Sequence, residues 1–311
     1  MTEDGPACPR SWVFPSSDSV LCLLKMPTTL VSTAQLADQL ANPDWVVFDC
    51  RFTLTDPGAG RTAYHANHIV GARYADLNED LSGPVTAQSG RHPLPDPEDL
   101  CTKLGAWGVG RQTQVVVYDD SHGSMAVRLW WLLRWLGHEN VALLDGGWPK
   151  WMREKRAMSA ELPHPRAQSF PCAVNAGVSV DAAAVDRYRL SADHRLIDAR
   201  PEQRFTGERE PLDAVAGHIP GAVNWEFEEN LDMDGTFLPA EELRESYSRL
   251  IQGVTPSNVI HTCGSGVTAC HNLLAMEIAG LSGSRLYPGS WSEWITDPTR
   301  PVATGDAVTA L

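Results

Sequence analysis

Residues 259–270 read Val-Ile-His-Thr-Cys-Gly-Ser-Gly-Val-Thr-Ala-Cys, and this stretch decides the fold. A β-branched run comes first, a turn of small residues follows, and the residues from Asn272 to Ala279 have a helical pattern. The stretch predicts a strand, a tight turn and a helix, with Cys263 in the turn. Unpaired backbone N–H groups and the positive end of a helix dipole stabilise a thiolate over a thiol at such a place.

Most free cysteines are simply small buried hydrophobic residues. Gly264 and Gly266 argue against that interpretation of Cys263. Glycine lets the backbone adopt positive φ angles and bring several amides close to one sulfur atom. We therefore predict that Cys263 is a reactive nucleophile.

The chain contains this pattern twice. Residues 116–120 (Val-Val-Tyr-Asp-Asp) align with residues 259–263 at an offset of 143, which places Asp120 opposite Cys263. Upstream, residues 48–51 match residues 197–200, and residues 68–72 match residues 218–222. The offset of 143 also aligns small and aromatic residues: Gly123 with Gly266, Ala126 with Ala269, Gly137 with Gly280, Gly146 with Gly289, Trp148 with Trp291, and Trp151 with Trp294. Such a repeat indicates two copies of one structural unit.

The two copies differ where chemistry is expected. Features that both copies keep are expected to be scaffold, such as caps, ion pairs and turns. A feature of one copy alone is a better candidate for function. The thiol of Cys263 is such a feature, because the first copy has Asp120 in its place.

Length and charge fit a two-domain protein that does not bind nucleic acid. The 311 residues, 43% of them hydrophobic, suffice for two cores. The net charge of −14, without a cluster of Lys and Arg between aromatic residues, leaves no surface for a phosphate backbone. We expect neither a metal nor a cofactor, because ligand spacings, a Gly-x-Gly-x-x-Gly motif and a Walker loop are all missing from the sequence.

Seven cysteines without framework spacing are typical of reduced thiols in a cytoplasmic protein. Cys270 lies about two helical turns beyond Cys263, too far for a disulfide between them, and is expected to be a packing residue. The remaining five are expected to be inert: Cys8, Cys22, Cys50, Cys101 and Cys172.

The first 27 residues are expected to be a disordered extension. Their apolar run from Val20 to Leu24 is too short for a signal peptide or a membrane span. Met26 is a candidate initiator.

Each half alternates strands and helices, which predicts an α/β fold with a parallel sheet flanked by helices in each of two tandem domains. Helices are expected over residues 33–40, behind a Ser32 or Thr33 cap, and 126–136. The expected strands are residues 45–49, 115–118 and 141–144 in the first half and 195–198, 258–261 and 285–287 in the second, with short strands after His68 and His218.

We place the domains at residues 28–157 and 179–301, with a tail at 302–311. Residues 158–178 hold Pro163, Pro165 and Pro171 and are expected to link the domains. Ligands of parallel sheets bind beyond the carboxyl ends of the strands, which is where the turn after residues 259–260 places Cys263.

In these residues the chain resembles the tandem-domain sulfurtransferases of the rhodanese superfamily. The resemblance implies an inactive first domain and an active second one. The segment from Cys263 to Ala269 is similar to the loop of 3-mercaptopyruvate sulfurtransferases. Thiosulfate sulfurtransferases of the vertebrate type carry Arg and Lys after the cysteine. The uncharged Gly264 and Ser265 favour mercaptopyruvate, because dianionic thiosulfate is attracted to cations beside the thiol.

The resemblance also implies a donor-binding group. An Arg-Phe-x-Gly segment of the family binds the anionic end of the donor, and Arg204-Phe205-Thr206-Gly207 matches it. A second arginine, expected shortly before Gly217, is missing from residues 208–215. Arg209 is a candidate substitute, and an ordinary surface ion pair is an equal alternative for it.

The implied mechanism is a two-step exchange in which Cys263 takes a sulfur from the donor and passes it to a thiol, thioredoxin or cyanide. Ser265 is expected to pass a proton to the leaving enolate, helped by His68 and, more weakly, by Asp56. A shared structural role for His68 stays open, because His218 occupies the same place in the repeat. The backbone amides of the loop would hold the persulfide: Gly264, Gly266, Val267, Thr268 and Ala269.

Three other functions are alternatives. Thiosulfate:cyanide sulfurtransferase activity is the main alternative. A Cys-x5-Arg phosphatase is disfavoured because Ala269 occupies the position of its phosphate-binding arginine. A non-catalytic interaction module is the alternative from a different class, and the first copy could itself be one. We expect no nucleic-acid or membrane partner.

Overall fold

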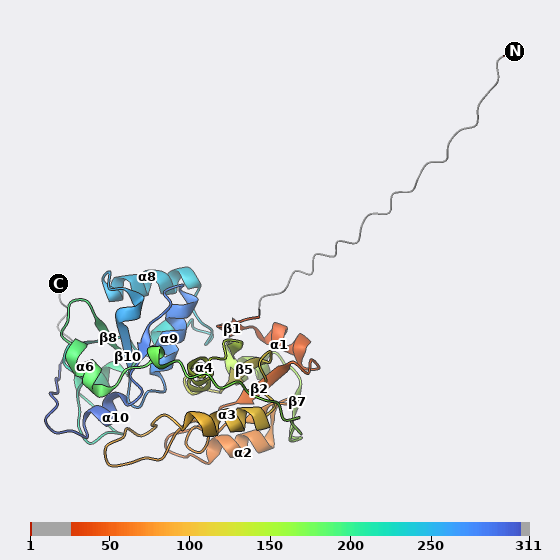
Figure 1. Ribbon diagram of the computed structural model, residues 1–311, viewed down its shortest axis with the longest axis horizontal. Helices are drawn as coiled ribbons and strands as arrows, with labels where there is room; N and C mark the ends of the chain where they lie inside the picture. Colours follow the sequence, from red (N-terminus) through yellow and green to blue (C-terminus); the bar gives the residue numbers. More distant parts are fainter. Residues whose placement is uncertain (2–25, 306–311) are drawn as a thin grey trace.

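The computed structural model describes residue 1 and residues 26–305. The predictions for Cys8, Cys22, the extension up to residue 25 and the tail beyond residue 305 lie outside these residues. Two α/β units lie side by side, with helix α4 (Ala126–Trp135) and helix α9 (Ala269–Ile278) at their junction (Figure 1). The predicted fold class is confirmed.

The first unit is built on a parallel sheet of order β1-β6-β5-β2-β4. Its central strands are almost wholly buried because helices cover both faces. The strands are β1 (Leu30–Val31), β2 (Trp45–Asp49), β4 (Arg73–Tyr74), β5 (Gln114–Tyr118) and β6 (Val141–Leu144). Helices α1 (Thr33–Gln39) and α5 (Gly147–Arg153) pack on one face, and α3 (Pro97–Ala106) and α4 on the other.

Local sequence explains where these helices begin. Ser32 caps α1 in a capping box, since its hydroxyl accepts from the Gln35 N–H while the Gln35 side chain accepts from the Ser32 N–H. Asp96 caps α3, with Pro97 at its first position. The predicted cap at Ser32 is confirmed.

The second unit repeats the arrangement with a parallel sheet of order β11-β10-β8-β9. Its strands are β8 (Arg195–Asp198), β9 (Ala222–Asn224), β10 (Val259–Thr262) and β11 (Arg285–Leu286). Helices α6 (Ala182–Tyr188), α7 (Glu202–Thr206) and α10 (Ser290–Trp294) cover one face, and α8 (Ala240–Ile251) and α9 cover the other. The predicted strands are therefore confirmed in both halves.

Shorter elements complete the chain. Helix α2 (Ala59–Ala66) precedes β3 (His68–Ile69), which pairs antiparallel with β7 (Met158–Ser159). Three single 3₁₀ turns lie in the second half: η1 (Ala176–Val178), η2 (Phe227–Asn230) and η3 (Pro256–Asn258). No helix among the described residues is long and apolar enough to cross a bilayer.

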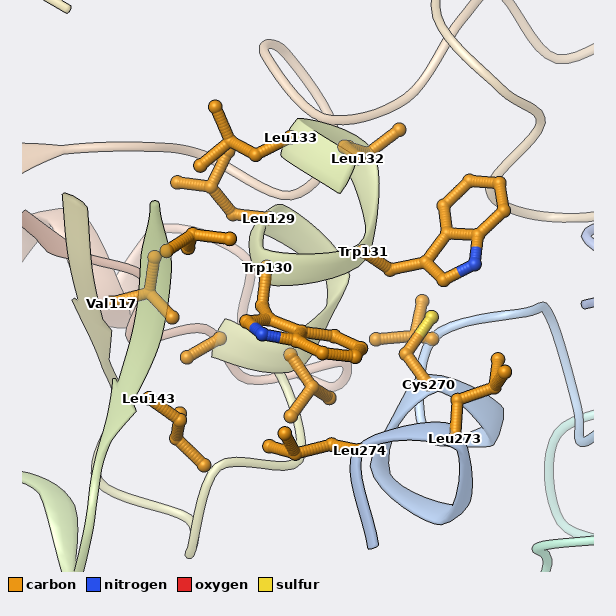
Figure 2. Close-up of a cluster of buried hydrophobic side chains, with 14 of the residues drawn as sticks. Val117, Leu129, Trp130, Trp131, Leu132, Leu133, Leu143, Cys270, Leu273 and Leu274 are labelled. Carbon is orange, nitrogen blue, oxygen red and sulfur yellow. The ribbon is translucent and has the colours of Figure 1, made fainter. Parts of the chain in front are cut away.

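One continuous hydrophobic core joins the two units. Figure 2 shows Trp130 and Trp131 of α4 directed toward Cys270, Leu273 and Leu274 of α9. Cys270 is fully buried, and burial raises the pKa of its thiol to about 12, so it packs rather than reacts. The shared core fixes one domain against the other, so groups from both can build one site.

The cysteine prediction needs one correction. Cys101 of α3 and Cys172 of the linker form a disulfide with a Cα–Cα distance of 5.8 Å, although all cysteines were expected to be reduced thiols. The linker lies along the first domain, where the Gln168 N–H donates to the Gly105 carbonyl, and this brings together two cysteines 71 residues apart in sequence. Cys50, Cys263 and Cys270 are the free cysteines of the described residues.

Candidate active site

Cys263 follows the last residue of β10, at the carboxyl edge of the second sheet. Its side chain is 1% exposed, and its N–H donates to Oγ of Ser290, 3.1 Å away. Ser290 donates in turn to the Tyr287 carbonyl at 2.9 Å and adopts a left-handed φ of 53°. A non-glycine residue in that region is strained, so Ser290 is held there by its surroundings. The repeat partner of Ser290 is Gly147, with a φ of 51°.

The loop from Cys263 to Thr268 has a conformation that requires glycine. Gly266 has a φ of +75°, and a Cβ atom there would lie 2.2 Å from the Pro288 carbonyl oxygen. No other residue fits without moving the backbone. The prediction that glycine shapes this loop is therefore supported at Gly266.

The equivalent loop of the first domain shows what its amides bind. The carboxylate of Asp119 accepts hydrogen bonds of 2.8–2.9 Å from four backbone N–H groups, those of Ser121, Gly123, Met125 and Ala126. At the offset of 143, these four correspond to Gly264, Gly266, Thr268 and Ala269. Within residues 26–305, none of those second-domain N–H groups donates to a protein acceptor.

Ser265 has a histidine partner from the other domain. Its Oγ lies 2.7 Å from Nδ1 of His92, and both residues are buried. Burial, followed by the charges of Arg128 and Arg91, lowers the pKa of His92 to about 3, so the ring is neutral at neutral pH. The carbonyl of His92 accepts from Nη2 of Arg128 at 3.1 Å, which fixes the segment that carries the ring.

Because His92 contacts Ser265, the assignment of His68 to this role from the sequence is corrected. Nδ1 of His68 lies 2.7 Å from the Tyr64 carbonyl, and Nε2 lies 3.1 Å from the Glu161 carbonyl. The ring stacks on Tyr64 and joins α2 to the linker, so it serves the scaffold. Asp56 is exposed, has its backbone bridged to Thr53, and does not line the cavity that Ser265 lines.

The two arginines predicted to bind the donor have different surroundings. Arg204 lines the cavity beside Cys263, where its guanidinium donates to the carboxylates of Glu210 and Asp213. Arg209 is exposed, does not line this cavity, and contributes a backbone hydrogen bond to Gln203. The structure thus places Arg204 at the site and Arg209 outside it.

The cavity beside Cys263 is small, about 60 Å³, and both domains line it. Leu54, Leu77, Met125, Arg91 and His92 come from the first domain. The second domain contributes Arg204 and the loop residues Cys263, Gly264, Ser265, Val267 and Thr268. Gly266 and Ala269 shape the loop without lining the cavity.

Sequence reasoning missed Arg91 and His92. A signal was available, because the matching segment of the second half, residues 232–239 before α8, contains neither arginine nor histidine. The rule that chemistry lies where the copies differ would have selected this pair over His68, which has His218 as its counterpart.

Comparisons with known proteins agree with this architecture. The family model described as Rhodanese-like domain matches residues 32–154 and 182–297. A Pseudomonas aeruginosa protein named "Probable 3-mercaptopyruvate sulfurtransferase" is 50% identical over 279 residues, covering 89% of this chain and 98% of that protein. The thiosulfate sulfurtransferase of Bos taurus is 33% identical over 276 residues, covering 85% and 91%.

A solved structure shows the same similarity. The 3-mercaptopyruvate sulfurtransferase SseA of Escherichia coli superimposes with a TM-score of 0.74 at 31% identity, covering 86% of this chain and all of that one. Both domains match the family model, and the alignments cover nearly the whole length of the relatives. The family assignment therefore does not depend on the loop motif alone. This chain belongs to the rhodanese family and carries two consecutive rhodanese-like domains.

Proposed function

We propose that this protein is a sulfurtransferase that moves a sulfur atom from 3-mercaptopyruvate, through a persulfide on Cys263, to a thiol or cyanide acceptor. The observation on which this depends most is the second-domain loop, where a buried thiol adjoins backbone N–H groups that have no acceptor among the described residues. The names of the relatives, 3-mercaptopyruvate and thiosulfate sulfurtransferases, support the same reaction class.

In the first step the thiolate of Cys263 attacks the sulfur of the donor. A sulfur–sulfur bond forms, the carbon–sulfur bond breaks, and its electron pair stays on the carbon of the pyruvate enolate. The proton of the donor thiol ends on that carbon, so the products are pyruvate and a Cys263 persulfide anion. In the second step the acceptor thiolate or cyanide attacks the outer sulfur and returns Cys263 as a thiolate.

The loop amides stabilise the charge that this cycle places on sulfur. In the first domain the corresponding four N–H groups bind the negative carboxylate of Asp119. We infer that the amides of Gly264, Gly266, Thr268 and Ala269 bind the persulfide anion in the same way. Val267 stays a prediction as a fifth donor.

The same comparison supports an inactive first domain. Asp120 replaces the thiol there, and the carboxylate of Asp119 already occupies the amides that an anionic sulfur would need. The first domain then serves the second by supplying Arg91, His92 and the apolar wall of the cavity.

Ser265 is the group that we propose to relay the proton to the enolate. His92 is neutral and a weak base, so it does not take the proton of Ser265. Its hydrogen bond to Ser265 instead fixes the direction of the hydroxyl group. Arg204, which also lines the cavity, binds the anionic end of the donor.

Thiosulfate is the second candidate donor, because Arg91 and Arg204 both approach Gly264 and place positive charge beside the thiol. For the acceptor we propose a thiol, reduced thioredoxin or cyanide. The three cysteines that are free among the described residues support a cytoplasmic location, and the Cys101–Cys172 disulfide argues against it.

Steady-state kinetics with both donors and one acceptor test the proposal. We expect a higher kcat/KM for 3-mercaptopyruvate and parallel double-reciprocal lines, which indicate a ping-pong exchange. A higher kcat/KM for thiosulfate would transfer the assignment to the second candidate, and no sulfur transfer from either donor would reject both.

A further inference from the structure

We propose that the second domain carries a binding site for a phosphate monoester at the edge of its sheet opposite Cys263. The site is a cavity where β8 and β9 begin, at Arg195 and Ala222. The strands are parallel, so their amino ends lie at the far edge from Cys263, which follows the end of β10. The cavity has a volume of about 620 Å³, typical of small-molecule sites, against about 60 Å³ beside Cys263.

Basic side chains gather in this cavity although the protein as a whole is acidic, with a net charge of −14. No Asp or Glu of the described residues lines it. Four basic residues do: Arg189, His194, Arg195 and His218. A cavity lined by charges of one sign attracts ligands of the opposite sign. The lining therefore fits an anion.

Three of these basic residues belong to the second copy of the repeat alone. Helix α6 aligns with α1, and β8 with β2, at an offset of 149. At this offset the first copy has apolar residues instead: Leu40 for Arg189, Trp45 for His194 and Val46 for Arg195. The shared fold does not require basic residues at this edge, so their presence in the second domain indicates a function beyond the fold.

The two guanidiniums have N–H groups that no described residue accepts. Arg195 donates from Nη2 to Oε1 of Gln252 at 2.9 Å, but its buried Nε has no acceptor among the residues that the structure describes. Arg189 donates from Nε to Asp186 at 2.9 Å and from Nη1 to the Pro220 carbonyl at 3.4 Å, which leaves its Nη2 without an acceptor in the described ranges. A bound anion would satisfy these donors.

His218 supplies a hydrogen-bond acceptor to the same cavity. It is 3% exposed, and its Nδ1 lies 2.8 Å from the Phe205 carbonyl, so Nδ1 carries the proton. Burial lowers the pKa of His218, so the ring is neutral at neutral pH and Nε2 has a free lone pair. In the first domain Nε2 of His68 contacts the Glu161 carbonyl, whereas Nε2 of His218 has no partner within residues 26–305.

A phosphate monoester matches this combination of donors and acceptor. Its oxygens accept from the guanidiniums, and with a second pKa of about 6 it can present an O–H to Nε2 of His218 near neutral pH. A carboxylate has no proton to donate at this pH. Apolar side chains in the lining fit the organic part of the ester: Leu190, Pro220, Val223 and Val254.

Calorimetric titration of the full-length protein with phenyl phosphate at pH 7 tests the site without sulfur transfer. We expect Arg195→Met to weaken binding about tenfold, because a charge-assisted hydrogen bond is lost. Arg189→Met should weaken binding as well, and Arg195→Lys should keep part of the affinity because the cation remains. Benzoate, which has no proton for His218, should bind about tenfold more weakly than phenyl phosphate.

Two control variants locate the ligand. Arg187→Met removes an exposed cation from the same helix, α6, and should leave the affinity unchanged because Arg187 does not line the cavity. Arg204→Met should also leave it unchanged, since Arg204 lines the cavity beside Cys263 instead.

Three results would overturn the inference. The first is a wild-type protein that does not bind phenyl phosphate. The second is binding that is lost in Arg204→Met and kept in Arg195→Met, which would place the phosphate at the thiol loop. The third is benzoate binding as tight as that of phenyl phosphate, which would show a general anion site without preference for a phosphate monoester.

Discussion

The guanidinium of Arg128, in α4 of the first domain, donates from Nη1 to the carbonyl of Gly266 in the thiol loop of the second, at 2.9 Å. Nη2 donates to the His92 carbonyl at 3.1 Å. The side chain is fully buried, and no carboxylate of the described residues forms an ion pair with it. One cation thus holds both segments of the active site.

The repeat makes this contact reciprocal. His271 of α9 occupies the position of Arg128 in the second copy, and its Nε2 lies 3.1 Å from the carbonyl of His122 in the first-domain loop. Each domain therefore reaches across the junction to hold the loop of the other. Arg128 holds the loop that contains the thiol, and His271 holds the loop that contains Asp120.

We predict that Arg128→Met lowers both the stability and the rate of persulfide formation. Two buried carbonyls lose their donor, at a cost of about 1–3 kcal/mol each in the free energy of unfolding. Denaturant titration and single-turnover kinetics measure the two effects. Arg134→Met is the control, since Arg134 also links α4 to α9, through Glu277, but lies partly exposed and does not contact the loop. Equal persulfide rates in the two variants would contradict the role given to Arg128.

Ser290 offers a test of strain against hydrogen bonding. Ser290→Ala removes the hydroxyl that accepts from the Cys263 N–H and leaves a side chain at the left-handed φ of 53°. Ser290→Gly removes the same acceptor but also relieves the strain, because glycine adopts this φ freely. We expect Ser290→Ala to be less stable than Ser290→Gly by about 1 kcal/mol. Sulfur transfer should fall in both variants. The opposite order of stability, measured by thermal unfolding, would show that φ at this position is not under strain.

The repeated elements and the features that depend on neighbouring residues could be predicted from the sequence. Apolar runs indicated the strands, the candidate caps Ser32 and Thr33 marked the start of α1, and glycines around Cys263 indicated the loop. Arg91 and His92 were missed because they lie in a segment whose place depends on how the two domains pack. The Cys101–Cys172 pair was missed for the same reason, since only the path of the linker brings the two residues together.

His68 shows why a repeated residue misleads. Its counterpart His218 has Nδ1 2.8 Å from the Phe205 carbonyl, as His68 has Nδ1 2.7 Å from the Tyr64 carbonyl. Both rings stack on an aromatic side chain of the preceding helix, Tyr64 of α2 and Phe205 of α7. The two histidines perform the same structural task, so their pattern in the sequence carried no information about catalysis.

The buried His92 predicts how stability depends on pH. Its pKa falls from 6.5 to about 3 on folding, so the unfolded chain binds more protons between these values. The stability conferred by neutral His92 is present above pH 6.5 and is lost as the pH falls toward 3. In His92→Gln, the slope of the free energy of unfolding against pH should decrease by about 1.4 kcal/mol per pH unit in that window. An identical slope in His92→Gln and the wild-type protein would show that His92 does not titrate on unfolding.

The disulfide should stabilise the first domain without affecting sulfur transfer. Cys172→Ser releases a loop of 71 residues and should lower the free energy of unfolding by about 2–4 kcal/mol. Turnover at Cys263 should stay unchanged, because Cys101 and Cys172 do not line the cavity. Peptide mapping without reductant should recover the Cys101 and Cys172 peptides joined, and recovery of two separate thiol peptides would contradict the pairing.

The most direct test of the Cys263 persulfide is the mass of the Cys263 peptide after exposure to 3-mercaptopyruvate without an acceptor. Cys263 and Cys270 lie in one tryptic peptide, residues 250–285, so fragment ions must locate the modification. We expect one added sulfur atom on Cys263, its loss when a thiol or cyanide is added, and none in Cys263→Ser. An added sulfur on Cys270, or none in the wild-type protein, would contradict it.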